Sequence, residues 1–148
     1  MANPRKIVGT HDGVGYRALT FLVDGVTISY SDTANLGSAV AGRAVTLVPG
    51  TQFAVELCDN GDPVLGRLDH VEPDGTCVVQ IEGECKLPQG DSVTVVRNGK
   101  IQGAQGASSA LGYVGPAVTT SAATLAVARH LVLDVATTTA LSVYLGAG

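Results

Sequence analysis

The stretch VLGRLDHVEPDGTCVVQI, Val64–Ile81, carries the clearest fold signal in the chain. Two strand-like runs flank a turn, in which Pro73 presets φ and Gly75 supplies the positive φ that a tight turn needs. After the turn, every second residue from Cys77 to Ile81 is apolar, so one face of the strand is apolar and the other is mixed. The stretch therefore predicts a β-hairpin, and it contains no recognisable reactive group.

Further strands are predicted on the amino-terminal side of this hairpin. Leu19–Val23 and Val26–Tyr30 alternate around Asp24-Gly25, which is typical of a type I′ turn, so they predict a second hairpin. Ser31–Gly42 is small and polar, which favours a loop. The elements predicted next are a strand over Ala44–Val48, a turn at Pro49-Gly50, a strand over Gln52–Cys58 and a turn at Asp59–Pro63.

The carboxyl-terminal half mixes strands with longer connections. Gly83–Gly90 is expected to be irregular, and Gln102–Ala123, rich in Gly, Ala and Ser, is expected to be a loop. Ser92–Arg97 leads into Asn98-Gly99, the strongest two-residue turn signal in the chain, and then Lys100-Ile101.

The last stretch is predicted as a closing hairpin. Leu131–Val135 and Leu141–Leu145 both alternate between apolar and other residues, with His130 on the polar face of the first strand. The β-branched residues Thr137-Thr138-Thr139 lie between them and disfavour a helix. A helix over Ala122–Ala140 is the alternative, because Ala122–Ala128 has good helix propensity.

Many short strands with regular turns predict an all-β protein, a small barrel or sandwich. We divide it into residues 1–35, an extended arm (Met1 to about Tyr16) with a hairpin, and residues 36–148, the barrel. The alternation predicts a core that includes Val45, Leu47, Phe53, Val55, Leu57, Cys77, Val79, Ile81, Val93, Val95, Leu131, Leu133 and Val143.

The composition limits the kinds of partner that the protein is expected to bind. The chain has 148 residues, a net charge of −4 and only 15% charged residues. Arg5-Lys6 is the single adjacent basic pair, so we expect no direct binding of nucleic acid. The sequence has no apolar run long enough to cross a membrane as a helix and no secretory signal pattern, so we expect no membrane partner. Three cysteines without a C-x-x-C pair indicate reduced thiols in a cytoplasm, where the chain is expected to be made.

The residue types that often act in catalysis or metal binding are far apart in this sequence. His11, His70 and His130 are far apart in sequence, and Asp69 and His70 are expected on opposite faces of a strand, which excludes a direct dyad. Asp59-Asn60-Gly61-Asp62 lacks the spacing of a calcium loop and is interpreted as a polar turn.

The candidate nucleophiles also lack their usual settings. Cys77 is expected to be buried, whereas Cys58 and Cys85 are allowed more exposure, with no activating neighbour. Ser108-Ser109 and Ser121 lack a nucleophile-elbow context, and Gly13-Val14-Gly15 is too short for a dinucleotide fingerprint. We predict no catalytic, cofactor-binding or metal residue, no cofactor, and a protein that is not an enzyme.

A family resemblance gives these features a context. Leu65-Gly66-Arg67-Leu68, Glu72–Thr76 and Val78-Val79-Gln80 are similar to stretches of the small β-barrel decoration, or cement, proteins on capsids of tailed bacteriophages and prophages. The similarity runs in order from about Ala34 to Leu145. It also takes in a strand at Gly42–Leu47, the Leu87-Pro88 step and the closing run Leu131–Leu145.

The resemblance implies a β-barrel on the outside of an icosahedral head, commonly a trimer near local threefold positions, that ties major capsid protein subunits together. It implies localisation in the virion and no catalytic residue set. Another phage structural component, such as a head fibre base, tail tube or baseplate protein, is the alternative. A ligand-binding barrel is a third class, disfavoured because the chain has two Phe, four Tyr and no Trp.

Overall fold

The computed structural model describes residues 16–91, 93–117, 130–137 and 140–146. It is nearly all β, as the sequence predicts, and includes a closed barrel of five strands. The expected arm before Tyr16 and the helix-prone Ala122–Ala128 lie outside these residues. The described elements are β1 (Arg17–Val23), η1 (Asn35–Gly37), β2 (Ala44–Leu47), β3 (Ala54–Leu57), β4 (Gly66–Val71), β5 (Thr76–Pro88), β6 (Ile101–Ala104), η2 (Ala107–Ser109), β7 (Tyr113–Pro116), β8 (Leu131–Thr137) and β9 (Ala140–Leu145).

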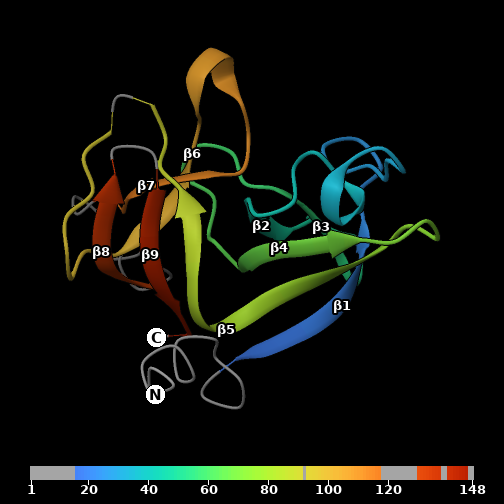
Figure 1. Ribbon diagram of the computed structural model, residues 1–148, viewed down its shortest axis with the longest axis horizontal. Coiled ribbons are helices and arrows are strands. Elements are labelled where there is room, and N and C mark those ends of the chain that lie inside the picture. The colour runs from blue at the N-terminus through green and yellow to red at the C-terminus, as the bar shows by residue number, and fades with distance from the viewer. Residues whose placement is uncertain (1–15, 92, 118–129, 138–139, 147–148) are drawn as a thin grey trace, which may run out of the picture.

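The barrel closes because β1 pairs on both of its sides. The strand order is β1-β3-β2-β4-β5, and β5 pairs back onto β1 (Figure 1). The β1–β3 pairing is parallel, and the other pairings of the barrel are antiparallel. The predicted Val64–Ile81 hairpin is confirmed as β4 and β5, and it forms one wall of the barrel. Closure removes the free sheet edges that an open set of these strands would expose.

Strand β5 is longer than predicted. Gly83–Gly90 was expected to be irregular, but β5 continues to Pro88 and pairs with β9 from Gly83 onward. Gly83 has φ +99°, which lets the strand bend from the barrel into this second pairing. The buried amide of Gln80 donates to the carbonyl oxygens of Glu82 and Glu84, at 3.0 and 3.2 Å, and so stabilises the bend.

The predicted closing hairpin is confirmed for the residues described in that region. Strands β8 and β9 pair antiparallel, and β9 extends the sheet from β5. The predicted turn at Asn98-Gly99 also forms, with φ +63° at Asn98, although no described residue from Val93 to Arg97 belongs to a strand. The turn lies against β8 instead, because Asn98 N–H donates to the Val132 carbonyl oxygen at 2.9 Å.

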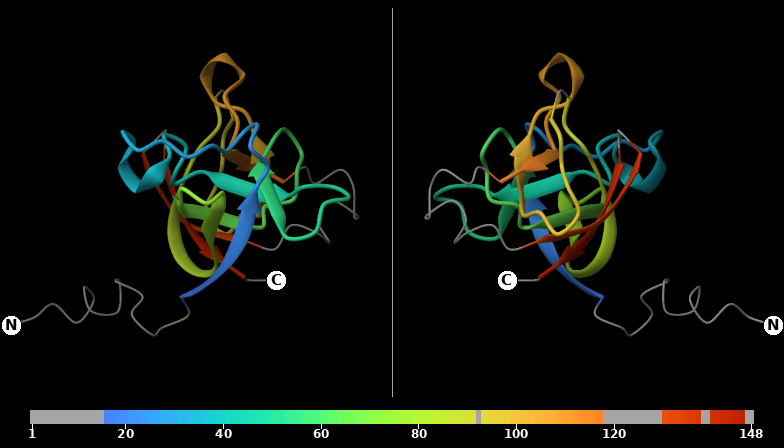
Figure 2. Two further views of the ribbon diagram at one scale, coloured as in Figure 1. Left: turned by 90° about the vertical axis from the view of Figure 1, so that its right-hand side faces the viewer. Right: turned by 90° about the vertical axis from the view of Figure 1, so that its left-hand side faces the viewer.

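The expected loop over Gln102–Ala123 is wrong within its described part. Strands β6 and β7 pair there as a two-stranded antiparallel sheet. Gly103 permits close packing, because a Cβ at that position would meet the carbonyl oxygen of Asp59. Small residues therefore serve strand packing rather than loop flexibility here. Residues 105–112, drawn in orange, project from the molecule in all three views (Figures 1 and 2).

The predicted hairpin over Leu19–Tyr30 is wrong. Strand β1 pairs with β5 and β3, and residues 26–30 form no strand. Asp24 ends β1 differently from a hairpin turn: its carboxylate accepts hydrogen bonds from Thr27 N–H (2.7 Å), Thr27 O–H (2.8 Å) and Ile28 N–H (2.9 Å). These bonds hold a local side-chain turn that competes with strand pairing.

Two apolar clusters form the core. One fills the barrel and includes Phe21, Ile28 and Leu68, and the other packs under β5, β9 and β8 and includes Leu87 and Val132. The predicted core residues that are buried are Val45, Val55, Leu57, Cys77, Val79, Val95 and Val143, with Ile81 and Val93 partly buried. Leu47, Phe53 and Leu133 were predicted inside but are exposed, and the side chain of Leu131 lies outside the described set.

Candidate functional site

Six of the exposed apolar residues form two groups on the surface, and others, among them Val26 and Leu36, lie outside both groups. The first, which we name the Phe53 patch, comprises Leu22, Leu47 and Phe53, with exposed fractions of 49%, 50% and 71%. The three residues lie at one end of the adjacent strands β1, β3 and β2. Leu22 N–H donates to the Phe53 carbonyl oxygen at 2.7 Å, and Leu47 pairs with Val55 of β3. Apolar groups left in water on adjacent strands mark a candidate protein interface.

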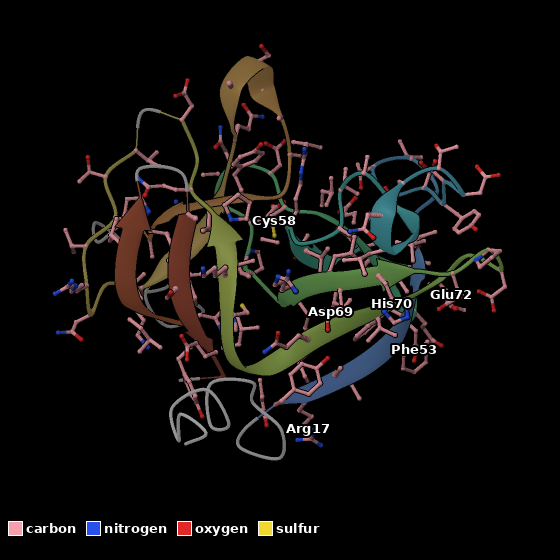
Figure 3. The ribbon with its side chains drawn as sticks, viewed as in Figure 1. Arg17, Phe53, Cys58, Asp69, His70 and Glu72 are labelled. Carbon is pink, nitrogen blue, oxygen red and sulfur yellow. The ribbon has the colours of Figure 1, made fainter. Side chains whose placement is uncertain are left out.

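Phe53 is the most unusual member of the patch. Its φ is +57°, a left-handed conformation that is rare for a bulky side chain. Its side chain lies at the periphery of the barrel, whereas Cys58 lies toward the interior (Figure 3). The isolated chain therefore carries both a conformational cost and an exposed aromatic ring at one position. Such strain is a reason to look for a function at that position.

Acidic side chains adjoin the Phe53 patch. Asp24 N–H donates to the carbonyl oxygen of Val55 at 3.1 Å, next to the patch, and Glu56 is the following residue on β3. Burial raises the pKa of Glu56, and the negative charges of Asp24 and Asp62 raise it further. Within the described residues, neither Asp24 nor Glu56 takes part in a salt bridge. The patch thus lies beside two carboxyl groups that form no ion pair within the part of the chain that the structure describes.

The second face, which we name the β8–β9 face, comprises Leu133, Val135 and Tyr144, all exposed. The pairing of β8 with β9 shifts register between Val132 and Asp134. Val132 pairs with the buried Val143 before the shift and is itself fully buried, whereas Leu133 lies at the shift and is exposed, which reverses the predicted inward side of this strand. A bulge of this kind changes which side chains face the core. The β8–β9 face belongs to the edge hairpin, away from the β1–β3 side of the barrel.

A polar cluster fixes the start of β1. Tyr16 O–H donates to Asp69 Oδ2 at 2.7 Å, and Arg67 forms an ion pair with Asp69 Oδ1 at 2.7 Å. The hydrogen bond to Asp69 raises the pKa of Tyr16 to about 12. Arg67 also donates to the Lys86 carbonyl oxygen at 3.1 Å. The cluster joins the start of β1 to β4 and β5 of the barrel wall. Its role is therefore structural.

The described histidines are not brought together. His70 Nε2 is 3.0 Å from Glu72 Oε1 on the surface, while Asp69 contacts Tyr16 and Arg67, so the two adjacent residues have different partners (Figure 3). His130 was predicted on a polar face, but it is 3% exposed. Its ring nitrogens contact the Val64 carbonyl oxygen and the Gly146 N–H. His11 lies outside the described residues.

The three cysteines are free and buried. Cys77 was predicted so, whereas Cys58 and Cys85, which were allowed more exposure, are buried as well. Burial raises the pKa of Cys77 to about 11 and that of Cys85 to about 12, and it raises the pKa of Cys58 further still. Thiols in such surroundings stay protonated near neutral pH and react slowly.

The Asp59–Asp62 turn is engaged in structural hydrogen bonds. Asp62 Oδ2 accepts from Asp59 N–H at 2.7 Å, and Asp59 Oδ1 accepts from the Gln105 side chain at 2.6 Å. Among the described residues, no three metal-ligating side chains lie close enough together to hold a metal ion. Ser108 and Ser109 are exposed in η2, and Ser121 and Gly13–Gly15 lie outside the described residues.

Comparison with known proteins adds no relative. No protein family matches the chain, and neither a curated protein nor a solved structure matches it. Among the described residues, no helix is long and apolar enough to span a membrane.

Sequence reasoning missed both apolar faces for two different reasons. At Phe53 it carried strict alternation through a residue with a left-handed backbone conformation. On β8 it assigned Leu131 and Leu133 to the inner side, whereas Val132 pairs with the buried Val143 and faces the core. The sequence signal available at Phe53 was weak: an aromatic residue close after Pro49-Gly50, where the chain reverses direction.

Proposed function

We propose that this chain is a structural virion protein, not an enzyme, that binds the outer surface of a tailed-phage head and stabilises it by bridging subunits of the major capsid protein. The observation that carries the proposal is the presence of two separate apolar faces on one small protein, one on the barrel and one on the β8–β9 hairpin. Two faces allow bridging, because one can contact the capsid while the other joins a second copy, so that the assembly holds several capsid subunits.

The chemistry of the described residues supports this assignment. The apolar side chains of the two faces are exposed and available for a protein contact, while the thiols and His130 are buried in structural contacts. Apolar and aromatic side chains supply most of the energy at protein interfaces. Binding through several modest sites gains affinity from effective concentration, so no deep binding cavity is required.

The proposal assigns the capsid contact to the β8–β9 face. Leu133, Val135 and Tyr144 lie on a hairpin that extends the sheet beyond the closed barrel. Because β8 is the edge strand of the sheet, the outer side of this hairpin is open to a neighbouring capsid subunit. The acidic side chains beside the Phe53 patch favour a positively charged partner over a second acidic surface.

A sedimentation experiment tests the proposal. The full-length chain would be mixed with expanded empty heads of the phage or prophage whose genome encodes it. We expect saturable co-sedimentation with the heads and none with isolated tails. The double variant Leu133→Ser, Tyr144→Ser is expected to lose binding, while Leu36→Ser, which alters an exposed apolar residue of η1 on the barrel side, keeps it.

The alternative assignment gives a different result. Co-sedimentation with tails or baseplates but not heads would make the chain another phage structural component. Absence of binding to any of these particles would remove the phage assignment.

A further inference from the structure

We propose that the Phe53 patch binds the segment Arg5-Lys6-Ile7-Val8 of a second copy of this chain, so that copies associate head to tail. This association does not require a capsid and can be tested without one. The argument starts from Phe53, whose left-handed φ of +57° and 71% exposure are both unfavourable in an isolated chain. An aromatic side chain held in this way is suited to be an interface anchor.

The negative charge near the patch indicates what kind of segment binds there. Asp24 and Glu56 adjoin it, and the negative charges of Asp24 and Asp62 act on Glu56. Two copies joined through identical patches would bring these carboxylates together, which disfavours a symmetric pairing. The favoured occupant combines apolar side chains with positive charge.

The chain carries one segment with this composition. Arg5-Lys6 is the only pair of adjacent basic residues in the sequence, and the apolar residues Ile7-Val8 follow it directly. The remaining basic residues outside this pair are isolated in sequence. The segment precedes β1, and it is joined to the barrel at Tyr16, whose hydroxyl is bonded to Asp69.

The direction of β1 favours association between copies. Tyr16 and Arg17 lie at the start of β1, and Leu22 of the patch lies near its end, about 20 Å further on for a strand of this length. To reach the patch of its own barrel, the segment would have to reverse direction at Tyr16 and run back along β1. A neighbouring copy can place its patch ahead of the segment instead, and the nine residue-to-residue steps from Ile7 to Tyr16 span up to about 30 Å.

Such a contact is heterologous, because one end of each copy meets the other end of the next. Heterologous contacts close into rings when the rotation between neighbours allows it. A ring of three copies is one such closure, so the contact offers a physical route to the trimer that the family resemblance implies.

Mixed cross-linking of full-length chains tests the proposal. One copy carries Val8→Cys, and a second copy with a different tag carries Leu47→Cys. We expect a disulfide between the two chains under mild oxidation, because the native cysteines are buried. The matched control replaces Leu47→Cys by Val96→Cys, an exposed position outside the patch, and should give about tenfold less product.

Two further variants separate specific docking from chance contact. Phe53→Gly, added to the Leu47→Cys chain, removes the anchor while suiting the backbone conformation, so it should reduce cross-linking without unfolding the chain. Glu56→Lys should reduce it as well, and Arg5→Glu with Lys6→Glu on the other copy should restore it.

Three results would overturn the proposal. They are equal cross-linking at positions 47 and 96, no effect of Phe53→Gly, and a disulfide that forms only within a single chain carrying both Val8→Cys and Leu47→Cys. The last result would show that the segment docks on its own barrel.

Discussion

The Nε2 atom of His130 lies 2.6 Å from the carbonyl oxygen of Val64. On the other side of the ring, Gly146 N–H donates to Nδ1 at 3.0 Å. Since Nδ1 accepts a hydrogen bond, Nε2 carries the proton and donates to Val64, which fixes the neutral tautomer. One buried ring therefore links the segment before β4 to both ends of the closing hairpin, and couples the barrel to the β8–β9 face.

His130→Leu is expected to destabilise the chain by about 2–3 kcal/mol, because it leaves a buried carbonyl oxygen and a backbone N–H without their partner. Urea unfolding followed by circular dichroism measures the loss. The matched control is His70→Leu at the exposed contact with Glu72, which should change the free energy of unfolding by less than about 0.5 kcal/mol. Equal effects of the two substitutions would contradict the role of His130.

Asp24 is expected to make stability depend on pH. Burial raises the pKa of its carboxyl group, but the hydrogen bonds from Thr27 and Ile28 lower it by more, and the net pKa lies below 3.8. The resulting stabilisation is present above the unfolded-state pKa of 3.8 and is lost as the pH falls through the lower folded-state value. Asp24→Asn should flatten the decline in stability below about pH 4, measured by urea unfolding at several pH values. An unchanged acid profile would contradict this account.

Phe53→Gly is expected to leave the free energy of unfolding unchanged or to raise it by about 1 kcal/mol. Glycine adopts φ +57° without strain, and the exposed ring contributes little to the core. The comparison substitution is Phe21→Gly, which removes a buried ring from the barrel and should cost about 4 kcal/mol or more. A loss above about 1 kcal/mol for Phe53→Gly would show that Phe53 supports the fold itself.

The thiols are expected to be unreactive in the folded chain. Because burial raises the pKa of Cys77 to about 11 and of Cys85 to about 12, the thiolate form is scarce at pH 8. A thiol reagent such as dithionitrobenzoate should label the three cysteines only as fast as the chain unfolds. Rapid labelling of any cysteine under native conditions would contradict the burial described above.

The parts of the fold set by local patterns could be predicted from the sequence. The Val64–Ile81 hairpin and the closing hairpin follow from alternation and turn residues, and both are present. Alternation failed where tertiary contacts override it: Gly83 lets β5 bend and continue, and β6 packs its glycine against Asp59. These effects depend on residues distant in sequence.

The candidate interface was harder to predict than the fold. Phe53 and Leu133 resemble core residues in a period-2 pattern, and only the backbone conformation places them in water. Asp24-Gly25 likewise has the residues of a hairpin turn, yet the Asp24 carboxylate binds Thr27 and Ile28 and directs the chain away from a hairpin. A local side-chain hydrogen bond competes with strand pairing, and sequence periodicity does not report it.

The measurement that tests the central claim most directly is the temperature at which expanded empty heads disrupt, recorded by scanning calorimetry with and without saturating full-length chain. A protein that bridges capsid subunits binds the intact head better than its separated subunits, so it must raise the disruption temperature. We predict a higher temperature with the chain, and no increase with the Leu133→Ser, Tyr144→Ser variant. An unchanged temperature with heads fully occupied by the chain would contradict the account.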